Sequence, residues 1–278
     1  MSTRTIRINS LSFRIRDDEH QRFWTKIEDG SWEPDTFGVF DRFVTPETTC
    51  LDVGCWEGPT LLYGGQLGRA AYGFEADPLA FAGLQRNLAA NPELTQIHIR
   101  HQCVAAKTGA VKFGSRAGGG DTMSSMLFAG GKTAWTVPGI RLDEFAAQEK
   151  LESPIFLKID TEGGEYEIMP TLHAFFRRYR TTLYLSTHPG FFGSVVTSLW
   201  AKARAHFGLV FALRSFAFIY DTEGRRIRLW ELLVKKKWRQ HVAIIATHEP
   251  WPERPARTPK AAENGSHAAG SGVSDNPT

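Results

Sequence analysis

The feature of this sequence that most constrains its fold is a short apolar strand ending in a glycine-rich turn, Asp52-x-Gly54-x-x-x-Gly58. Pro59 follows, and because proline suits the first turn of a helix, a helix is predicted to begin there. A second apolar strand then ends at Glu75. Strand, turn, helix and strand in this order are typical of a nucleotide-binding α/β unit. In such a unit the ligand binds beyond the carboxyl ends of the strands.

The residues of the turn favour S-adenosylmethionine over NAD as that ligand. A dinucleotide-binding turn has glycine where this chain has Asp52, because a pyrophosphate must approach the start of the helix. A carboxylate there repels pyrophosphate but suits a zwitterionic amino acid and a sulfonium. We expect the carboxylate of Glu75 to accept hydrogen bonds from both ribose hydroxyls. The predicted cofactor-binding residues are Asp52, Gly54, Trp56, Gly58, Glu75, Ala76 and Val104.

Strand and helix patterns alternate from Thr49 to about His206. The alternation predicts an α/β fold with right-handed crossovers, namely a Rossmann-like, doubly wound and mostly parallel sheet. Apolar residues at 209–220 and 242–247 predict two late strands that are close in the sequence. Their proximity favours an antiparallel strand at the edge of the sheet. The spacing of apolar residues between Ile168 and Tyr179 predicts a further helix.

Composition divides the chain into three expected parts. Residues 1–48 form an N-terminal extension so rich in aromatic side chains that we expect it to be folded and packed. Residues 49–250 are expected to form the catalytic domain. The segment 251–278 consists mainly of small and polar residues and proline after Trp251, so it is predicted to be a disordered tail.

Charge and cysteine content disfavour several classes of protein. The 3 cysteines, at positions 50, 55 and 103, fit neither a disulfide framework nor a zinc motif. A formal net charge of +3 is too small to indicate nucleic acid, and no DNA partner is expected. The sequence shows no apolar run long enough to cross a bilayer and no signal-peptide core. A cytoplasmic location is therefore the expectation.

With these motifs in place, residues 49–247 resemble the FkbM-type S-adenosylmethionine-dependent methyltransferases. The resemblance implies the class I methyltransferase fold and S-adenosylmethionine as the cofactor. It also implies O-methylation of a hydroxyl on a sugar, a glycan or a secondary metabolite. Two positions depart from the family's usual pattern: Trp56 stands where a small residue is usual, and Ser186 where an acidic one is usual. The matching segments are 51–54, 73–78, Leu84 with Asn87, Ser124-Ser125, 141–143 and, the most specific, 156–165.

Methyl transfer to a hydroxyl requires an aligned acceptor, exclusion of water and a base for the hydroxyl proton. The candidate bases follow two neighbouring predicted strands: Asp160 and Glu162 follow one, and His188 follows the next. Histidine has a pKa suited to base chemistry near neutrality. Plainer interpretations stay open, because acids suit a helix N-terminus, which is favoured for Glu165, and His188 can simply hydrogen-bond its loop. A divalent ion would suit the same three side chains, but such a set is not diagnostic and no metal is predicted.

Two further segments each admit two interpretations. The glycine-rich run 118–120, followed by Ser124 and Ser125, is either a mobile loop that closes over the substrate or a plain surface loop. The basic segment Arg225–Arg239 is best interpreted as an amphipathic helix that packs on the sheet edge. Weak contact of this segment with an anionic membrane, a phosphorylated carrier or RNA is the alternative.

Two other functions remain as alternatives to a small-molecule or glycan O-methyltransferase. The first is an RNA ribose methyltransferase, because Lys158, Asp160 and Glu162 resemble the Lys/Asp/Glu sets of such enzymes. The second is a non-catalytic cofactor-binding protein, which the intact donor motif disfavours. Methylation of a base nitrogen is disfavoured because the Asn/Asp-Pro-Pro-aromatic motif of those enzymes is absent from the sequence.

Overall fold

The computed structural model describes residues 3–16, 20–115, 133–190, 192, 196, 198–234 and 241–253. At its centre lies a seven-stranded sheet with the order β11-β12-β10-β9-β3-β4-β5. Strands β5, β4, β3, β9 and β10 are parallel, and β12 runs antiparallel to both β10 and β11. This arrangement confirms the predicted doubly wound sheet with an antiparallel edge. The strands are β3 (Thr49–Val53), β4 (Ala70–Phe74), β5 (Ile97–Arg100), β9 (Ile155–Ile159), β10 (Thr181–Thr187), β11 (Phe218–Tyr220) and β12 (Val242–Thr247).

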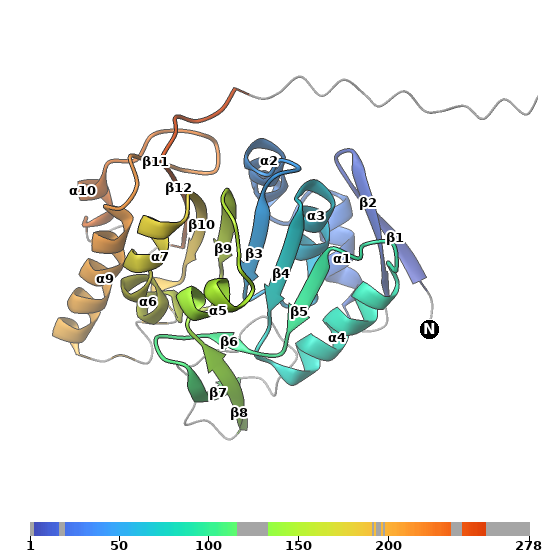
Figure 1. Cartoon of the computed structure of the whole chain (residues 1–278), viewed down its shortest axis with the longest axis horizontal. Coiled ribbons are helices and arrows are strands. Elements are labelled where there is room, and N and C mark those ends of the chain that lie inside the picture. The colour runs from blue at the N-terminus through green and yellow to red at the C-terminus, as the bar shows by residue number, and fades with distance from the viewer. Residues whose placement is uncertain are drawn as a thin grey trace, which may run out of the picture.

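Helices cover both faces of the sheet (Figure 1). One face packs on a core to which α3 and α4 contribute, and the other on a core built from the helices that follow β8. Because each side chain of a strand points to one face or the other, the central strands are buried along their whole length. The helices after the N-terminal segment are α3 (Pro59–Leu67), α4 (Pro78–Ala89), α5 (Leu142–Gln148), α6 (Glu165–Ile168), the 3-10 helix η2 (Met169–Thr171), α7 (His173–Arg178), α9 (Leu199–Leu213) and α10 (Leu229–Leu232).

The N-terminal segment is folded and packs against the face covered by α3 and α4. It consists of a hairpin, β1 (Thr3–Ile8) and β2 (Leu11–Arg16), and two helices, α1 (Gln21–Glu28) and α2 (Pro34–Phe43). Trp24 of α1 is fully buried in the core that this segment shares with α3. Asn87 of α4 accepts a hydrogen bond from the backbone N–H of Arg16 and donates one to the carbonyl of Glu57. This side chain thereby ties the hairpin to the loop after β3.

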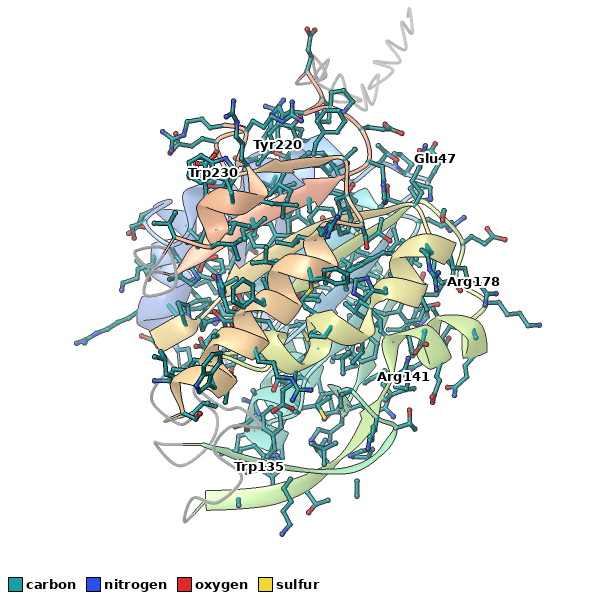
Figure 2. All side chains as sticks on the ribbon, turned by 90° about the vertical axis from the view of Figure 1, so that its left-hand side faces the viewer. Glu47, Trp135, Arg141, Arg178, Tyr220 and Trp230 are labelled. Atoms are coloured by element: carbon teal, nitrogen blue, oxygen red, sulfur yellow. The ribbon has the colours of Figure 1, made fainter. Side chains whose placement is uncertain are left out.

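A second, three-stranded sheet lies at the carboxyl end of β5, below the main sheet in Figure 1. It consists of β6 (Cys103–Val104), β7 (Gly109–Ser115) and β8 (Thr133–Ile140), in the order β6-β8-β7. Trp135, labelled at the lower edge of Figure 2, donates a hydrogen bond from its indole N–H to the carbonyl of Ala76 at 2.9 Å. The small sheet is therefore fastened to the turn that follows β4.

Two elements differ from the sequence-based expectations. The predicted strand at 209–220 is wrong: α9 continues to Leu213, and only Phe218–Tyr220 forms a strand. A short apolar run rich in Leu, Val and Phe suits either a buried strand or a buried helix, so its composition could not decide between them. The single helix expected between Ile168 and Tyr179 is divided into α6, η2 and α7, because Pro170 cannot continue a regular helix. Within the described ranges, no helix has the length and hydrophobicity needed to cross a membrane.

Candidate active site

The glycine-rich turn after β3 lies in close contact with the carboxyl end of the neighbouring parallel strand, β9. Gly54 has a φ of +80°, and a Cβ at this position would lie 1.9 Å from the backbone carbonyl oxygen of Asp160. The backbone N–H of Asp160 donates to the carbonyl of Val53 at 3.0 Å. Only glycine fits both the positive φ and the contact. The turn consequently brings the carboxyl ends of β3 and β9 together.

Glu75, at the end of β4, is fixed by the backbone. Its Oε2 accepts the N–H of Trp56 at 2.8 Å, and its Oε1 accepts the N–H of Asp77 at 2.7 Å. The residue is buried, and this burial raises the pKa of its carboxyl to about 7 against the two hydrogen bonds that lower it. Each carboxylate oxygen has a second acceptor position. The carboxylate can therefore still accept two hydroxyl groups of a ligand.

A single cavity joins the two ends of the predicted site. At one end it is lined by predicted cofactor-binding residues, and at the other by the three predicted catalytic residues. Phe113 and Cys103 add apolar wall next to the cofactor-binding end. The predicted residues that line the cavity are Gly54, Trp56, Glu75, Ala76, Val104, Asp160, Glu162 and His188.

Two predicted cofactor-binding residues do not line the cavity. Gly58 has a φ of +88° at the start of α3, and a Cβ there would lie 2.5 Å from Leu84 Cδ1, so it permits helix packing. Asp52 is buried behind the wall, where its Oδ2 accepts the hydroxyl of Thr60 at 2.6 Å. Its Oδ1 lies 3.4 Å from Lys158 Nζ. The structure thus places the Asp52 carboxylate against a buried cation.

Lys158 is that cation, and the sequence interpretation gave it no role in the preferred function. Its side chain is 4% exposed and lies between the carboxylates of Asp52 and Asp160, with Nζ 3.2 Å from Asp160 Oδ2. Burial alone would lower the pKa of Lys158, but the two carboxylates outweigh burial and raise it above its usual value. Burial likewise would raise the pKa of Asp160, but Lys158 and His188 hold it below its usual value. Both groups are therefore charged at neutral pH.

His188 follows β10 and lies among three carboxylates. Its Nε2 is 3.5 Å from Asp160 Oδ1 and 3.7 Å from Glu162 Oε2, and its Nδ1 is 3.6 Å from Glu165 Oε1. Burial would lower the pKa of His188, but Glu165, Asp160 and Glu162 outweigh it and raise the pKa to about 9. The imidazole is consequently protonated at neutral pH.

The pKa of Glu162, unlike that of Asp160, is raised above its usual value. Burial raises it to about 7, against the effect of His188, which lowers it. The Oε2 atom is buried and accepts no hydrogen bond from the residues that the structure describes. Its backbone has a φ of +50°, which is uncommon for a residue other than glycine and occurs often at functional sites. These properties distinguish Glu162 from the strongly paired Asp160.

Glu165, for which the sequence favoured a helix N-terminus, does begin α6. It is also fully buried, and its Oε1 accepts the backbone N–H of His188 at 2.6 Å. Its Oε2 accepts the N–H of Gly163 at 2.8 Å and the hydroxyl of Thr161 at 3.2 Å. Glu165 therefore fixes the positions of the loops that carry Glu162 and His188. This role requires a contact between segments that are distant in the sequence.

The N-terminal segment supplies one wall of the cavity. The sequence did not indicate that Glu33 would belong to this wall. This residue precedes α2, lines the cavity, and has a pKa raised by burial and by the nearby Asp160. Trp32 and Phe23 line it as well, with ring centroids 5.2 Å apart. Trp56 packs edge-on against Phe23 at 4.5 Å. Trp32 of the N-terminal segment therefore forms part of the cavity wall.

One group of side chains in the described ranges has the composition of a metal site. The potential ligand atoms of Asp160, Glu162 and His188 all lie within 4.8 Å of one another. Two carboxylates and an imidazole could hold a divalent cation. The absence of a metal therefore stays a prediction.

Two other segments that the sequence analysis considered lie outside the described residues: 118–120 with Ser124 and Ser125, and the basic residues 235–239.

Residues 52–220 match the family model described as the methyltransferase FkbM domain. No curated protein matches the chain. Among solved structures, the FkbM methyltransferase of Methylobacillus flagellatus KT is 14% identical, with 55% of this chain and 39% of that chain covered and a TM-score of 0.38. An rRNA methylase of Streptococcus thermophilus is 9% identical, with 77% and 95% covered and a TM-score of 0.41. A TehB-like SAM-dependent methyltransferase of Corynebacterium glutamicum is 11% identical, with 82% and 95% covered and a TM-score of 0.41.

Proposed function

The chain belongs to the FkbM methyltransferase family, and on that premise we propose that it transfers the methyl group of S-adenosylmethionine to a hydroxyl of a sugar, a glycan or a secondary metabolite. One observation carries the proposal. A single cavity contains both Glu75, held by two backbone amides at the end of β4, and Glu162, whose buried Oε2 atom accepts no hydrogen bond from the described residues. The first suits a ribose, and the second suits an acceptor proton.

The residues at the Glu75 end of the cavity fit S-adenosylmethionine. The Glu75 carboxylate would accept the ribose hydroxyls, and the apolar side chains of Ala76, Val104 and Phe113 would contact the adenine. Gly54 would let the backbone approach the amino-acid part of the donor. When bound, the donor supplies an electrophilic methyl group on a sulfonium. We propose that Asp52, Gly58 and Trp56 support this end indirectly, Asp52 through Thr60 and Lys158.

Glu162 is the base that we propose for the acceptor hydroxyl. A base works best when its pKa lies near the working pH, and the pKa of Glu162 is about 7. Asp160 is a weaker base, because Lys158 and His188 keep its pKa low. His188 cannot take a proton while it is already protonated, and its pKa of about 9 leaves it so at neutral pH. Its role in the proposal is to hold Asp160 and Glu162 in position.

The lining of the acceptor end supports a hydroxyl-rich acceptor. The rings of Trp32 and Phe23 offer flat apolar surfaces, and the carboxylates of Glu33, Asp160 and Glu162 offer hydrogen-bond acceptors. Hydroxyl groups donate to carboxylates, while the apolar face of a sugar ring packs on aromatic side chains. The clustered carboxylates would repel a phosphate or carboxylate group on the acceptor.

An RNA acceptor is less well supported. The backbone of RNA carries many phosphates, and a protein that binds it presents accessible cations to them. Lys158 is enclosed between two carboxylates and is 4% exposed, so it does not offer its charge to a phosphate. A non-catalytic donor-binding protein would have no need of the Glu162–His188–Asp160 group that lines the cavity. We further propose a cytoplasmic location. As a partner other than the acceptor, we propose an anionic surface that the segment near α10 contacts weakly.

The experiment that tests the function has two parts. Calorimetric titration with S-adenosylmethionine and separately with NAD should show micromolar binding of the first alone (about 10⁻⁶ M). Labelled donor should then transfer its methyl group to members of a panel of neutral polyols and glycosides, with the product identified as a methyl ether by NMR. Glu162→Gln should lower kcat by about 10²–10⁴-fold and leave donor affinity unchanged.

Glu167→Gln is the matched control, because Glu167 is an exposed glutamate on α6, the helix that begins three residues after Glu162. If both variants turn over equally well, Glu162 is not the base. If the donor fails to bind, the methyltransferase proposal is overturned. Methylation of a nitrogen acceptor with no ether product would retain the donor assignment and overturn the O-methylation.

A further inference from the structure

A large apolar surface is exposed on the side of the molecule opposite the N-terminal segment. We call it the α9–α10 face, and it is the left side of Figure 1 and the side toward the viewer in Figure 2, where Trp230 is labelled. The exposed fraction is 87% for Trp200, 60% for Trp230, 56% for Phe211 and 52% for Phe207. Aromatic side chains of this size are costly to leave in water, and a group of them marks an interaction site.

The exposure follows from the amphipathic pattern of α9. Its inner side chains, among them His206, Leu209 and Leu213, are buried against the domain. Gly208 packs over Pro170, since a Cβ there would lie 3.1 Å from the proline ring. The orientation of the helix is therefore fixed by its inner side. The exposed outer stripe has helical spacing of four and three residues and consists of Trp200, Arg204, Phe207, Phe211 and Arg214.

The outer stripe of α9 borders an apolar groove. Phe207, Gly208 and Phe211 line it from α9, and Leu229 and Leu233 line it from α10 and the residue after that helix. The groove is open to solvent. Exposed Leu199 and Val234 extend the apolar surface at the two ends of these elements.

The charged side chains of α9, and of the residue that follows it, are all positive. α9 contains Lys202 and Arg204, is followed by Arg214, and includes no Asp or Glu. The Arg214 guanidinium lies over the ring of Phe211, 5.4 Å from its centroid. α10 follows exposed Arg228, and its single acid, Glu231, accepts the backbone N–H of Arg228 at 2.9 Å. Aromatic rings and cations thus share the outer stripe of α9, and α9 itself carries no carboxylate.

We propose that the α9–α10 face docks onto the surface of an anionic lipid bilayer. Tryptophan and phenylalanine insert at the boundary between headgroups and acyl chains, while arginine and lysine bind anionic headgroups. The chemistry of the face matches this surface in both respects. Docking of this kind lies in the membrane plane and needs no spanning helix.

The same observations disfavour the other occupants of the face. A second copy of the chain would bring Arg204 and Arg214 against an equally basic surface. RNA would stack on the rings and bind the arginines, but it offers nothing to the aliphatic side chains of Leu199, Leu229 and Val234. A bilayer can contact the aromatic, the cationic and the aliphatic side chains of this face. The proposal is independent of the methyl acceptor.

The test is sedimentation of the full chain with lipid vesicles. The chain should sediment with vesicles that contain about 30 mol % phosphatidylglycerol and remain in the supernatant with pure phosphatidylcholine vesicles. Raising the salt concentration from about 50 to 500 mM should lower binding several-fold, because headgroup charges are screened. The double variant Trp200→Ser/Trp230→Ser, and separately Arg204→Glu/Arg214→Glu, should each lower the partition coefficient at least about tenfold.

Two matched controls separate this face from general surface effects. Leu79→Ser removes an apolar side chain that is 58% exposed on α4, and Arg22→Glu reverses an exposed charge on α1. Neither should change partitioning. A brominated lipid should also quench tryptophan fluorescence in the parent chain and less in the Trp200→Phe/Trp230→Phe variant.

Several outcomes would overturn the proposal. These are equal binding to both vesicle types, no binding to anionic vesicles, or an equal loss in the controls. Concentration-dependent dimerisation that Trp200→Ser/Trp230→Ser abolishes would assign the face to a second copy instead. Salt-sensitive binding of an RNA oligonucleotide with no vesicle binding would assign it to RNA. The quenching experiment and a circular dichroism spectrum decide the matter if a serine variant fails to fold.

Discussion

The two ends of the cavity are held in place by different interactions. At the donor end, Glu75 is fixed by the backbone amides of Trp56 and Asp77, which belong to two adjacent turns. At the acceptor end, Lys158, Asp160 and His188 are fixed by one another's charges. Backbone amides stay in position when a side chain changes, whereas each member of a charge network depends on the others. The donor end should therefore tolerate single substitutions in its surroundings, and the acceptor end should respond as a unit.

Gly54→Val is expected to have the largest effect, because Gly54 is where the two ends touch. The new Cβ would lie 1.9 Å from the carbonyl of Asp160, and valine strongly disfavours a φ of +80°. We expect a loss of more than about 4 kcal/mol in the free energy of unfolding, together with loss of donor binding. Thermal unfolding and donor titration would measure the two effects.

The control for this variant is Gly38→Ala, because a Cβ at Gly38 meets no atom within 4 Å and this glycine lies within α2. It should stabilise the chain slightly, by about 0.5–1 kcal/mol. A Gly54→Val protein that folds and binds donor normally would show that the two strand ends need not touch.

Lys158→Met is the variant that distinguishes an effect on the acceptor end of the cavity from an effect on the donor end. Removing the ammonium leaves the buried carboxylate of Asp52 and the partly buried carboxylate of Asp160 without their shared cation. Loss of one partner from a buried charge group costs about 3–5 kcal/mol. We expect a fall of that size in denaturant unfolding and a greater loss of turnover than of donor affinity.

Lys26→Met, at an exposed position of α1, should change stability by less than about 0.5 kcal/mol. If the Lys158→Met protein loses donor affinity as much as turnover, the ends are not independent. Equal stability of the two variants would mean that the buried charges find another compensation.

Glu75→Ala probes the donor end alone. The substitution removes both proposed ribose acceptors and the carboxylate to which the N–H groups of Trp56 and Asp77 donate. We expect donor affinity to fall by about 10²-fold, since hydrogen bonds to a charged group contribute about 1.5–3 kcal/mol. The measurement is calorimetric titration at a fixed pH.

Asp77→Ala serves as the neighbour control. Asp77 accepts the N–H groups of Leu79 and Ala80 as the N-cap of α4, so its loss should cost about 1 kcal/mol of stability and little donor affinity. Equal donor affinities in the two variants would show that Glu75 does not bind the ribose.

The same contrast explains what could be predicted from the sequence. Gly54 and Glu75 were identified because they belong to two adjacent strand–turn units, and local patterns determine such units. Glu33 precedes α2 and Asp160 follows β9, and their proximity depends on how the N-terminal segment packs. Local patterns carry no information about such a contact.

Asp52 shows the limit of the motif itself. The sequence placed its carboxylate at the turn after β3, beside the donor. The structure turns the side chain toward Thr60 and Lys158, behind the cavity wall. Which side chain a strand residue meets depends on the register between β3 and β9, where Asp52 lies opposite Lys158. Lys158 therefore matters to the site through pairing, and its own position in the sequence did not reveal this.

The pH dependence of turnover is the smallest effect and reports on the acceptor end only. Glu162 must be ionised to act as a base, so kcat should rise about tenfold per pH unit below about 7 and then level off. Above about 9, His188 loses its proton, and Asp160 and Glu162 lose the cation between them. Turnover should fall there. Since the two groups interact, the apparent values belong to the pair.

His188→Gln should remove the alkaline limb of this profile and leave the acid limb, while donor affinity stays unchanged across both. The pH dependence of stability reports independently on the protonation of His188. The folded-state pKa of His188 is raised above its usual value of 6.5, so its contribution to stability is complete below pH 6.5 and is lost as the pH rises through about 9. The parent protein should therefore lose more of its melting temperature between pH 6.5 and 9.5 than the His188→Gln variant does. If both lose the same amount, the imidazole is not held protonated by the three carboxylates, and the acceptor end is not the charge network described above.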